Sequence, residues 1–123
     1  MEVLLDTNFI ISCILKRIDF ISQLEEKGFK IVIPKEVIEE LKDLRFRKGQ
    51  SHEERIAIDA AFEMFQHNKL KKMGLGGRSI DEALIKKGKE GVYIATLDNL
   101  IKKQVPNKIV IHSATGKIIV VRS

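Results

Sequence analysis

Cysteine, tryptophan and proline are scarce in this sequence, and the scarcity of cysteine excludes whole classes of protein. The 123 residues include one cysteine, Cys13, two prolines and no tryptophan. A single cysteine cannot form an intramolecular disulfide, so the chain is not a disulfide scaffold. No Cys/His cluster offers the spacing of a zinc site either. We expect Cys13 to be a small buried residue of the first helix.

Long apolar runs are absent as well. No run approaches the roughly 18 residues that a membrane-spanning helix needs. The N-terminal segment has no basic stretch before an apolar one, which a secretory signal would require. We therefore expect a cytoplasmic protein with no membrane partner.

Composition and charge indicate a folded domain with a polyanionic partner. Hydrophobic residues make up 44% of the chain and charged residues 32%, which is too apolar for intrinsic disorder. The length fits one domain over residues 1–123. Twenty-two Lys and Arg against seventeen Asp and Glu give a formal charge of +5, which favours a partner such as nucleic acid.

The hydrophobic pattern alternates between short apolar runs and helical periodicity. This alternation predicts an α/β fold with a mainly parallel central sheet, covered on both faces, and an antiparallel strand at one edge. The glycine stretch at residues 73–77 follows no expected strand and precedes no Lys-Ser/Thr pair, so it is interpreted as a flexible joint, not a phosphate loop. The expected strands are 2–5, 30–33, 92–96, 108–111 and 117–121; the expected helices are 9–15, 18–27, 35–46, a segment from the break at 47–51 to about 67, 79–88 and 99–103.

Two aspartates follow expected strands directly. Asp6 comes after the first strand, and Asp98 comes just past the strand at residues 92–96. Because ligands of parallel α/β sheets bind beyond the carboxyl ends of the strands, both side chains are expected in one pocket. Each could instead cap the helix that follows it.

A helical wheel selects a third acid, Glu40. In the helix at residues 35–46, Glu40 lies on the border of the apolar stripe, whereas Glu39 and Asp43 point towards solvent. Glu40 is therefore a candidate ligand, with a solvated carboxylate beside the core as the plainer alternative.

The same wheel selects Asp81 in the helix that Ser79 opens. Asp81 lies on the border of the stripe and Glu82 lies outside it. Ser79 and Glu82 form a capping-box pattern. Asp81 repeats the placement of Glu40, although it could serve only the dipole of its helix.

Four converging carboxylates would repel one another unless a cation compensates their charge. The candidates are Asp6, Glu40, Asp81 and Asp98. All-oxygen ligation suits Mg²⁺ or Mn²⁺ better than zinc. The acids therefore predict a divalent metal site.

The segments that carry these acids resemble the PIN-domain nucleases. The matching segments are Leu5–Asn8, Ile33–Leu41, Ser79–Leu84 and Ala95–Asp98. They occur in the family's order and span most of the chain. Among subgroups, the glycine stretch before Ser79 and the ending at residues 112–120 look most like the archaeal relatives of the Fcf-type ribosomal-RNA processing proteins.

The resemblance implies a PIN-like three-layer α/β/α fold and an endoribonuclease that hydrolyses RNA phosphodiesters with Mg²⁺ or Mn²⁺. Asp6 and Asp98 would bind the principal ion, Glu40 would orient or deprotonate the water, and Asp81 would complete the ligand shell. The supporting polar residues would be Thr7, Asn8 and Thr96.

Binding of RNA is expected to depend on basic residues around the pocket mouth, because phosphate contacts supply most sequence-independent affinity. A run of charge is more often only a solvated helix face. The candidates are Arg45, Arg47, Lys48 and Arg78.

Other functions remain open at the level of sequence. A phosphorelay receiver domain is excluded because Asp6 has no second acid beside it. The chain could be the toxin ribonuclease of a toxin-antitoxin pair, with an antitoxin partner, or a non-catalytic RNA-binding PIN scaffold. A ribosome-assembly partner would accompany a role in ribosomal RNA processing. Phe62, Met64 and Phe65 suit the core, although pairing through helices to form a homodimer is an alternative.

Overall fold

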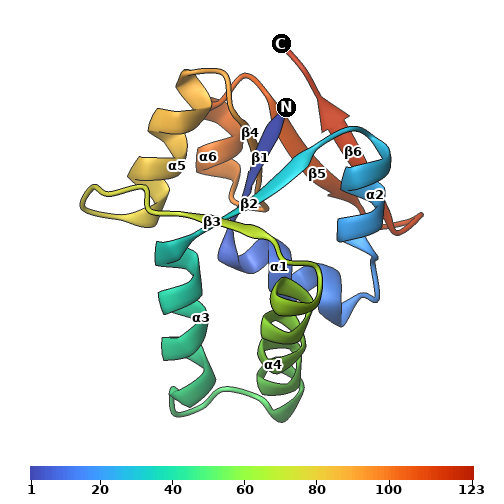
Figure 1. Ribbon diagram of the computed structural model, residues 1–123, viewed down its shortest axis with the longest axis vertical. Coiled ribbons are helices and arrows are strands. Elements are labelled where there is room, and N and C mark those ends of the chain that lie inside the picture. Colours follow the sequence, from blue (N-terminus) through green and yellow to red (C-terminus); the bar gives the residue numbers. More distant parts are fainter.

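Six strands form one sheet at the centre of the computed structural model, which describes residues 1–123 (Figure 1). They are β1 (Glu2–Leu5), β2 (Lys30–Pro34), β3 (Lys71–Met73), β4 (Tyr93–Ala95), β5 (Lys108–His112) and β6 (Lys117–Val121). Their order in the sheet is β3-β2-β1-β4-β5-β6. All neighbours are parallel except β5 and β6, which are antiparallel. The sheet therefore has the expected parallel centre and one antiparallel edge.

Six helices cover this sheet on two sides. They are α1 (Thr7–Leu15), α2 (Phe20–Glu26), α3 (Lys35–Phe46), α4 (His52–His67), α5 (Ile80–Lys89) and α6 (Asn99–Gln104). In Figure 1, α5 and α6 lie together on one side, and α3 and α4 stand as a hairpin on another. None of the six helices has both the length and the apolar character needed to cross a membrane.

Alternation along the strands divides the core between the two layers. In β1, Val3 and Leu5 join a cluster of 22 buried residues that includes residues of α1 to α4. Leu4, between them, points to the other face and joins a cluster of six with residues of α5 and α6. Successive side chains of a strand face opposite sides, so apolar runs of this kind are typical of strands covered on both faces. The predicted three-layer α/β/α fold is confirmed.

The expected elements need two corrections. Strand β3 was missed because only Met73 among its three residues is even partly buried, the two lysines being exposed. It pairs with β2 at the sheet edge, so the glycine stretch does follow a strand, contrary to the prediction. The second helix begins at Phe20 and not at residue 18, because the Asp19 side chain accepts a hydrogen bond from the N–H of Ser22 and caps the helix.

Candidate metal centre

Asp6 lies at the carboxyl edge of the sheet, between β1 and α1. Its own N–H donates to the carbonyl of Ala95 (2.9 Å) on the neighbouring strand β4. Its Oδ1 accepts the N–H of Thr7 (2.8 Å), which starts α1. The residue is only 7% exposed. Asp6 therefore caps a helix, as one interpretation had it, and also sits at the strand end where a ligand would bind.

Thr96 joins the ends of β1 and β4. Its hydroxyl donates to Oδ2 of Asp6 (2.9 Å) and accepts the N–H of Asp98 (3.1 Å). Thr96 is fully buried, so this link is shielded from competing water. The pair of strand-end acids predicted from the sequence is thus tied together through one side chain.

Asp98 serves as the N-cap of α6. Its Oδ1 accepts the N–H groups of Leu100 (2.8 Å) and Ile101 (3.3 Å). The half-buried carboxylate keeps its second oxygen, Oδ2, without a hydrogen bond in the structure. Capping therefore leaves one oxygen of Asp98 available to another ligand.

Glu40 and Asp81, on two different helices, lie within electrostatic range of the strand-end acids. Glu40 is half-buried on α3, and Asp81 is exposed in the first turn of α5. Desolvation raises the pKa of Asp81, and the negative charges of Asp98 and Glu40 raise it further. Glu40 and Asp81, which the helical wheels placed on the border of the apolar stripe, therefore each interact electrostatically with a strand-end acid.

The same repulsion reaches Asp6. Burial raises the pKa of the Asp6 carboxyl, and this effect outweighs the hydrogen bonds from Thr96 and Thr7, which lower it. The charges of Asp81 and Glu40 add to the rise. Each of the four acids therefore interacts with at least one of the others, and their charges are not compensated by a nearby basic residue in these interactions.

The donor chemistry fits a hard divalent cation. All candidate ligands are carboxylate oxygens, and no histidine or thiol takes part, which favours Mg²⁺ or Mn²⁺ over zinc. Oγ1 of Thr7, which is 1% exposed and next to Asp6 in the chain, is buried without a hydrogen-bond partner. No three acidic, histidine or cysteine side chains lie close enough here to surround one ion, so ligation would require the side chains of Glu40 or Asp81 to turn inwards.

The predicted supporting residues have different environments. Thr96 is hydrogen-bonded to Asp6, and the backbone of Thr7 donates to the same carboxylate. Asn8 is exposed. Thr96 and Thr7 therefore contact the acid directly, whereas Asn8 lies at the surface of α1.

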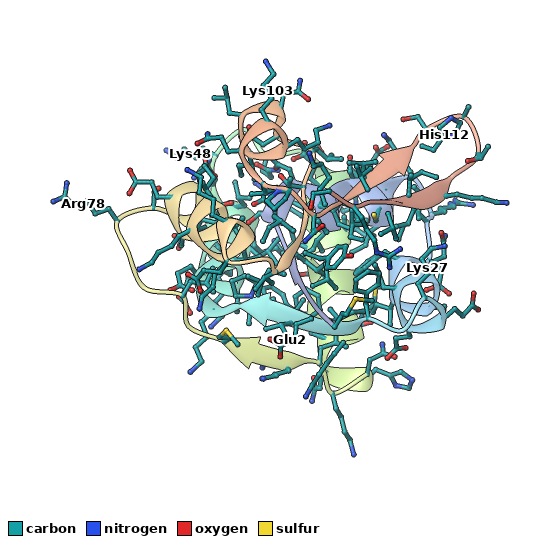
Figure 2. All side chains as sticks on the ribbon, turned by 90° about the horizontal axis from the view of Figure 1, so that it is seen from above. Glu2, Lys27, Lys48, Arg78, Lys103 and His112 are labelled. Atoms are coloured by element: carbon teal, nitrogen blue, oxygen red, sulfur yellow. The ribbon has the colours of Figure 1, made fainter.

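The predicted RNA-binding residues are spread over two places. Arg45 pairs with Asp59 of α4 (2.8 Å), and Arg47 and Lys48 follow the far end of α3. Because an α-helix rises about 1.5 Å per residue, Arg47 lies roughly 10 Å from Glu40 along the axis of α3. Arg78 is at the outer end of the loop before α5 and projects away from the body (Figure 2). Arg78 lies three residues before Asp81, and Arg45 lies five residues after Glu40.

Glu36 is a residue that sequence analysis did not identify. Its carboxylate accepts the N–H of Leu75 at Oε1 (3.1 Å) and Oε2 (3.0 Å), and the N–H of Gly76 at Oε2 (2.9 Å). These partners are backbone groups 39 and 40 residues away, so no local motif could have indicated them. A weak signal was its position one helical turn before Glu40.

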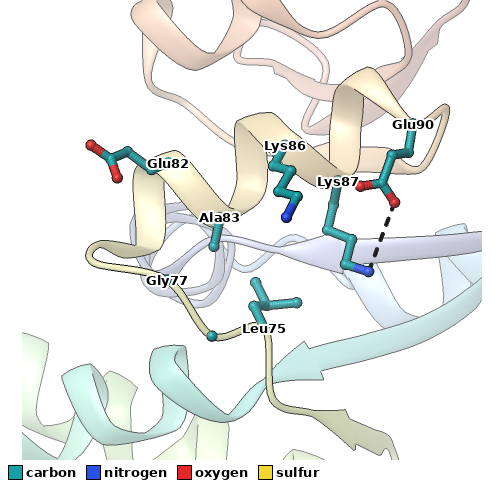
Figure 3. A pocket seen from close by; sticks show the side chains of 8 residues that line it. Leu75, Gly77, Glu82, Ala83, Lys86, Lys87 and Glu90 are labelled. Atoms are coloured by element: carbon teal, nitrogen blue, oxygen red, sulfur yellow. Dashed lines mark ion pairs between the residues drawn. The ribbon is translucent and has the colours of Figure 1, made fainter.

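The largest cavity lies beside α5 and not at the acids. It has a volume of about 430 Å³ and none of the four acids lines it. Figure 3 shows Leu75 and Gly77 of the loop on one side and Lys86 and Lys87 of α5 on the other. The four acids therefore lie outside this cavity: Asp81 is exposed, Glu40 and Asp98 are half-buried, and Asp6 is buried.

Comparison with known proteins agrees with this architecture. A family model described as the PIN domain matches residues 3–115. The solved structure of the PIN domain endonuclease Utp24 superposes with a TM-score of 0.74 at 22% identity, covering 99% of this chain and 92% of that one. A domain of a functionally unknown protein from Methanocaldococcus jannaschii gives a TM-score of 0.51 at 23% identity, covering 84% of this chain and 85% of that one. No curated protein matches the sequence.

At these identities the two structures establish a shared fold. The family model spans most of the sequence and includes all four candidate acids. The chain therefore belongs to the PIN domain family.

Proposed function

We propose that this protein is an endoribonuclease that hydrolyses RNA phosphodiesters with Mg²⁺ or Mn²⁺ at Asp6, Glu40, Asp81 and Asp98. The observation that carries the proposal is the placement of Asp6 and Asp98 at the carboxyl ends of neighbouring strands, joined through the Thr96 hydroxyl, with Glu40 and Asp81 within electrostatic range. Carboxylates at or near a strand end, two of which (Asp6 and Asp81) have a pKa raised chiefly by burial, are typical of a functional site. Family membership supports nuclease chemistry at this site.

We assign the role of each acid from whether hydrogen bonds hold its carboxylate in place. Asp6 and Asp98 are fixed by hydrogen bonds and would bind the cation. Glu40 and Asp81 make no hydrogen bond with their carboxylates here, so Glu40 is free to orient or accept a proton from the attacking water, and Asp81 to complete the shell. When bound, a divalent ion would lower the pKa of that water and would stabilise negative charge on the phosphate oxygens.

RNA is the proposed substrate because the chain carries a formal charge of +5, which favours a polyanionic partner. The similar structure Utp24 is described as an endonuclease. The resemblance to Fcf-type proteins supports ribosomal RNA processing as the setting. Contacts to phosphate would come from Arg78 first and from Arg45, Arg47 and Lys48 at the far end of α3.

The experiment is cleavage of end-labelled single-stranded RNA with Mn²⁺ or Mg²⁺, with EDTA added in a parallel reaction. The variant Asp6→Asn removes one charge but keeps a side chain of the same shape. Asp43→Asn is the matched control, because Asp43 lies exposed on α3. We expect Asp43→Asn to cleave like the wild type.

We expect EDTA to stop cleavage and Asp6→Asn to slow it by about 100-fold or more, since metal assistance contributes several kcal/mol and each 1.36 kcal/mol is a factor of ten. Cleavage that persists in EDTA, or in Asp6→Asn at the wild-type rate, would refute the proposed site.

A further inference from the structure

Glu36 and Glu40 occupy equivalent positions on successive turns of α3. Residues four apart on a helix lie on the same face, one above the other. Glu40 interacts electrostatically with Asp6 and Asp81, whereas Glu36 accepts hydrogen bonds from the loop that leads into α5. One helix face therefore supplies an acid of the site and also contacts the segment that carries another.

The contact of Glu36 with the loop is strong for a surface group. Two consecutive backbone N–H groups, of Leu75 and Gly76, point at one carboxylate at 2.9 to 3.1 Å. Desolvation raises the pKa of Glu36, but the hydrogen bonds from Leu75, Gly76 and its own N–H, together with the charge of Lys35, lower it, and the net shift is downwards. The loop therefore binds the charged carboxylate, and charge-assisted bonds of this kind are about twice as strong as neutral ones.

Besides its contact with Glu36, the loop is held by Leu75, which is half-buried and packs against the smaller core cluster, whereas the two glycines that follow have few neighbours. A Cβ atom at Gly76 would meet nothing within 4 Å, and one at Gly77 would meet only Ala83 at 3.9 Å. The cavity of about 430 Å³ separates the loop from the outer face of α5 (Figure 3). Gly76 and Gly77 both have positive φ values, 74° and 89°, which other residues rarely adopt. The reversal is therefore held by the packing of Leu75 and by Glu36, which is the one side chain hydrogen-bonded to it.

The position of α5 depends on where this reversal lies. Ser79 caps α5, its hydroxyl accepting the N–H of Glu82 (3.1 Å), and Asp81 lies in the first turn. The cap is therefore the third residue after Gly76, and Asp81 is the fifth. A shift of Gly76 would be passed to Asp81 over this short distance.

From these contacts we infer that Glu36 is a positioning residue that fixes the loop at Leu75 and Gly76 and so places Asp81 against Glu40 and Asp98. The inference rests on the proposed function, because the placement matters only if these acids act together on a cation. Glu36 itself does not touch the substrate or the ion.

The test compares three variants. Glu36→Ala removes the carboxylate, and Glu36→Gln keeps an amide oxygen that can accept the same N–H groups. Glu39→Ala is the control, since Glu39 is exposed and pairs only with Lys42 of its own helix (3.4 Å). For each variant we would measure the Mn²⁺ concentration that gives half-maximal RNA cleavage, kcat and KM for RNA, and hydrogen exchange at residues 75–81.

We expect Glu36→Ala to raise the half-maximal Mn²⁺ concentration about tenfold, the lower end of the range for groups that orient metal ligands. The KM for RNA should stay constant, and exchange at Leu75 and Gly76 should accelerate. Glu36→Gln, which keeps one of the two acceptor oxygens and no charge, should restore part of the metal response, and Glu39→Ala should match the wild type. A wild-type metal response in a folded Glu36→Ala protein overturns the inference.

Hydrogen exchange keeps the two proposals apart because it does not depend on cleavage. If the wild type leaves RNA intact, the proposed function fails, and the exchange data then decide the placement alone. Lost protection over residues 75–81 in Glu36→Ala, recovered in Glu36→Gln, supports the positioning role. Unchanged protection in Glu36→Ala overturns it.

Discussion

The two helical layers differ greatly in how much they bury. The layer of α1 to α4 shares a cluster of 22 buried residues with the sheet, whereas the layer of α5 and α6 shares a cluster of six. Asp6 and Glu40 belong to the larger layer, and Asp81 and Asp98 to the smaller one. The candidate site thus joins a firmly packed half to a lightly packed half, so the second half depends on a few specific contacts.

One such contact is the close approach of α5 and α6 at Gly88. A Cβ atom there would meet Cγ1 of Val105 at 2.3 Å and Cγ1 of Ile94 at 3.1 Å. The contact between Glu36 and the loop is another.

The lightly packed layer also carries basic residues in the last turns of its two helices: Lys86, Lys87, Lys89, Lys102 and Lys103.

The largest effects should come from core truncations that compare the layers directly. Leu41 on α3 and Leu84 on α5 are both fully buried, so Leu→Ala at either should cost about 3 kcal/mol of the free energy of unfolding. We expect Leu84→Ala alone to lose RNA cleavage at lower urea than it loses circular dichroism, because α5 can open locally. Coincident transitions in both variants would show that the layers unfold as one unit.

Gly88→Ala is expected to lower the free energy of unfolding somewhat less than the leucine truncations do. The added methyl group cannot fit against Val105 without movement, which should cost about 2 kcal/mol of stability in urea denaturation. Gly88→Ala combined with Val105→Ala should recover part of that loss, because the smaller side chain opens the space. If the stability loss of the double variant equals the sum of the two single losses, α5 and α6 are not closely packed at Gly88 and Val105.

The burial of Asp6, with a smaller contribution from the charges of Asp81 and Glu40, should appear as a pH dependence of stability without metal. The folded-state pKa of Asp6 is raised above the ordinary 3.8, so the folded protein binds more protons than the unfolded one between these values. The free energy of unfolding contributed by this group therefore falls as pH rises through that window, and the loss persists at neutral pH.

Asp6→Asn should consequently stabilise the metal-free protein at neutral pH relative to the wild type, with the difference shrinking as pH approaches 4. Urea denaturation in EDTA at several pH values measures this, with Asp43→Asn as the control. Added Mn²⁺ should stabilise the wild type but not Asp6→Asn. A wild type that is more stable than Asp6→Asn in EDTA would show that the acids are not in conflict.

The smallest effects concern the basic residues. Arg78→Ala should weaken RNA binding and reduce the salt slope by about one unit if its guanidinium contacts one phosphate. Arg45→Ala should change RNA binding less, because Arg45 is paired with Asp59, and should cost at most about 1 kcal/mol of stability. Fluorescence anisotropy over a salt series distinguishes them, and a larger effect at Arg45 would place the RNA path along α3 and α4.

Most of the fold and the acid set could be predicted from the sequence because their signals are local. Asp6 and Asp98 follow apolar strands, and Glu40 follows from the wheel of its own helix. Cys13 is buried in α1 as expected. These features depend on periodicity within a few residues of one another.

Features that depend on distant partners were missed. Strand β3 is a polar edge strand whose existence rests on pairing with β2, and the partners of Glu36 are backbone groups of a remote loop. The close packing at Gly88 likewise depends on α6. None of these has a sequence pattern of its own, since tertiary contacts create them.

The most direct test of the account is a crystal structure of the protein grown with Mn²⁺, with anomalous data collected to locate the ion. We predict manganese at the carboxyl edge of the sheet, bound by Asp6 and Asp98. The side chains of Glu40 and Asp81 should be turned towards the ion, so that both layers contribute ligands. Manganese bound elsewhere, or only by residues of one layer, would contradict it.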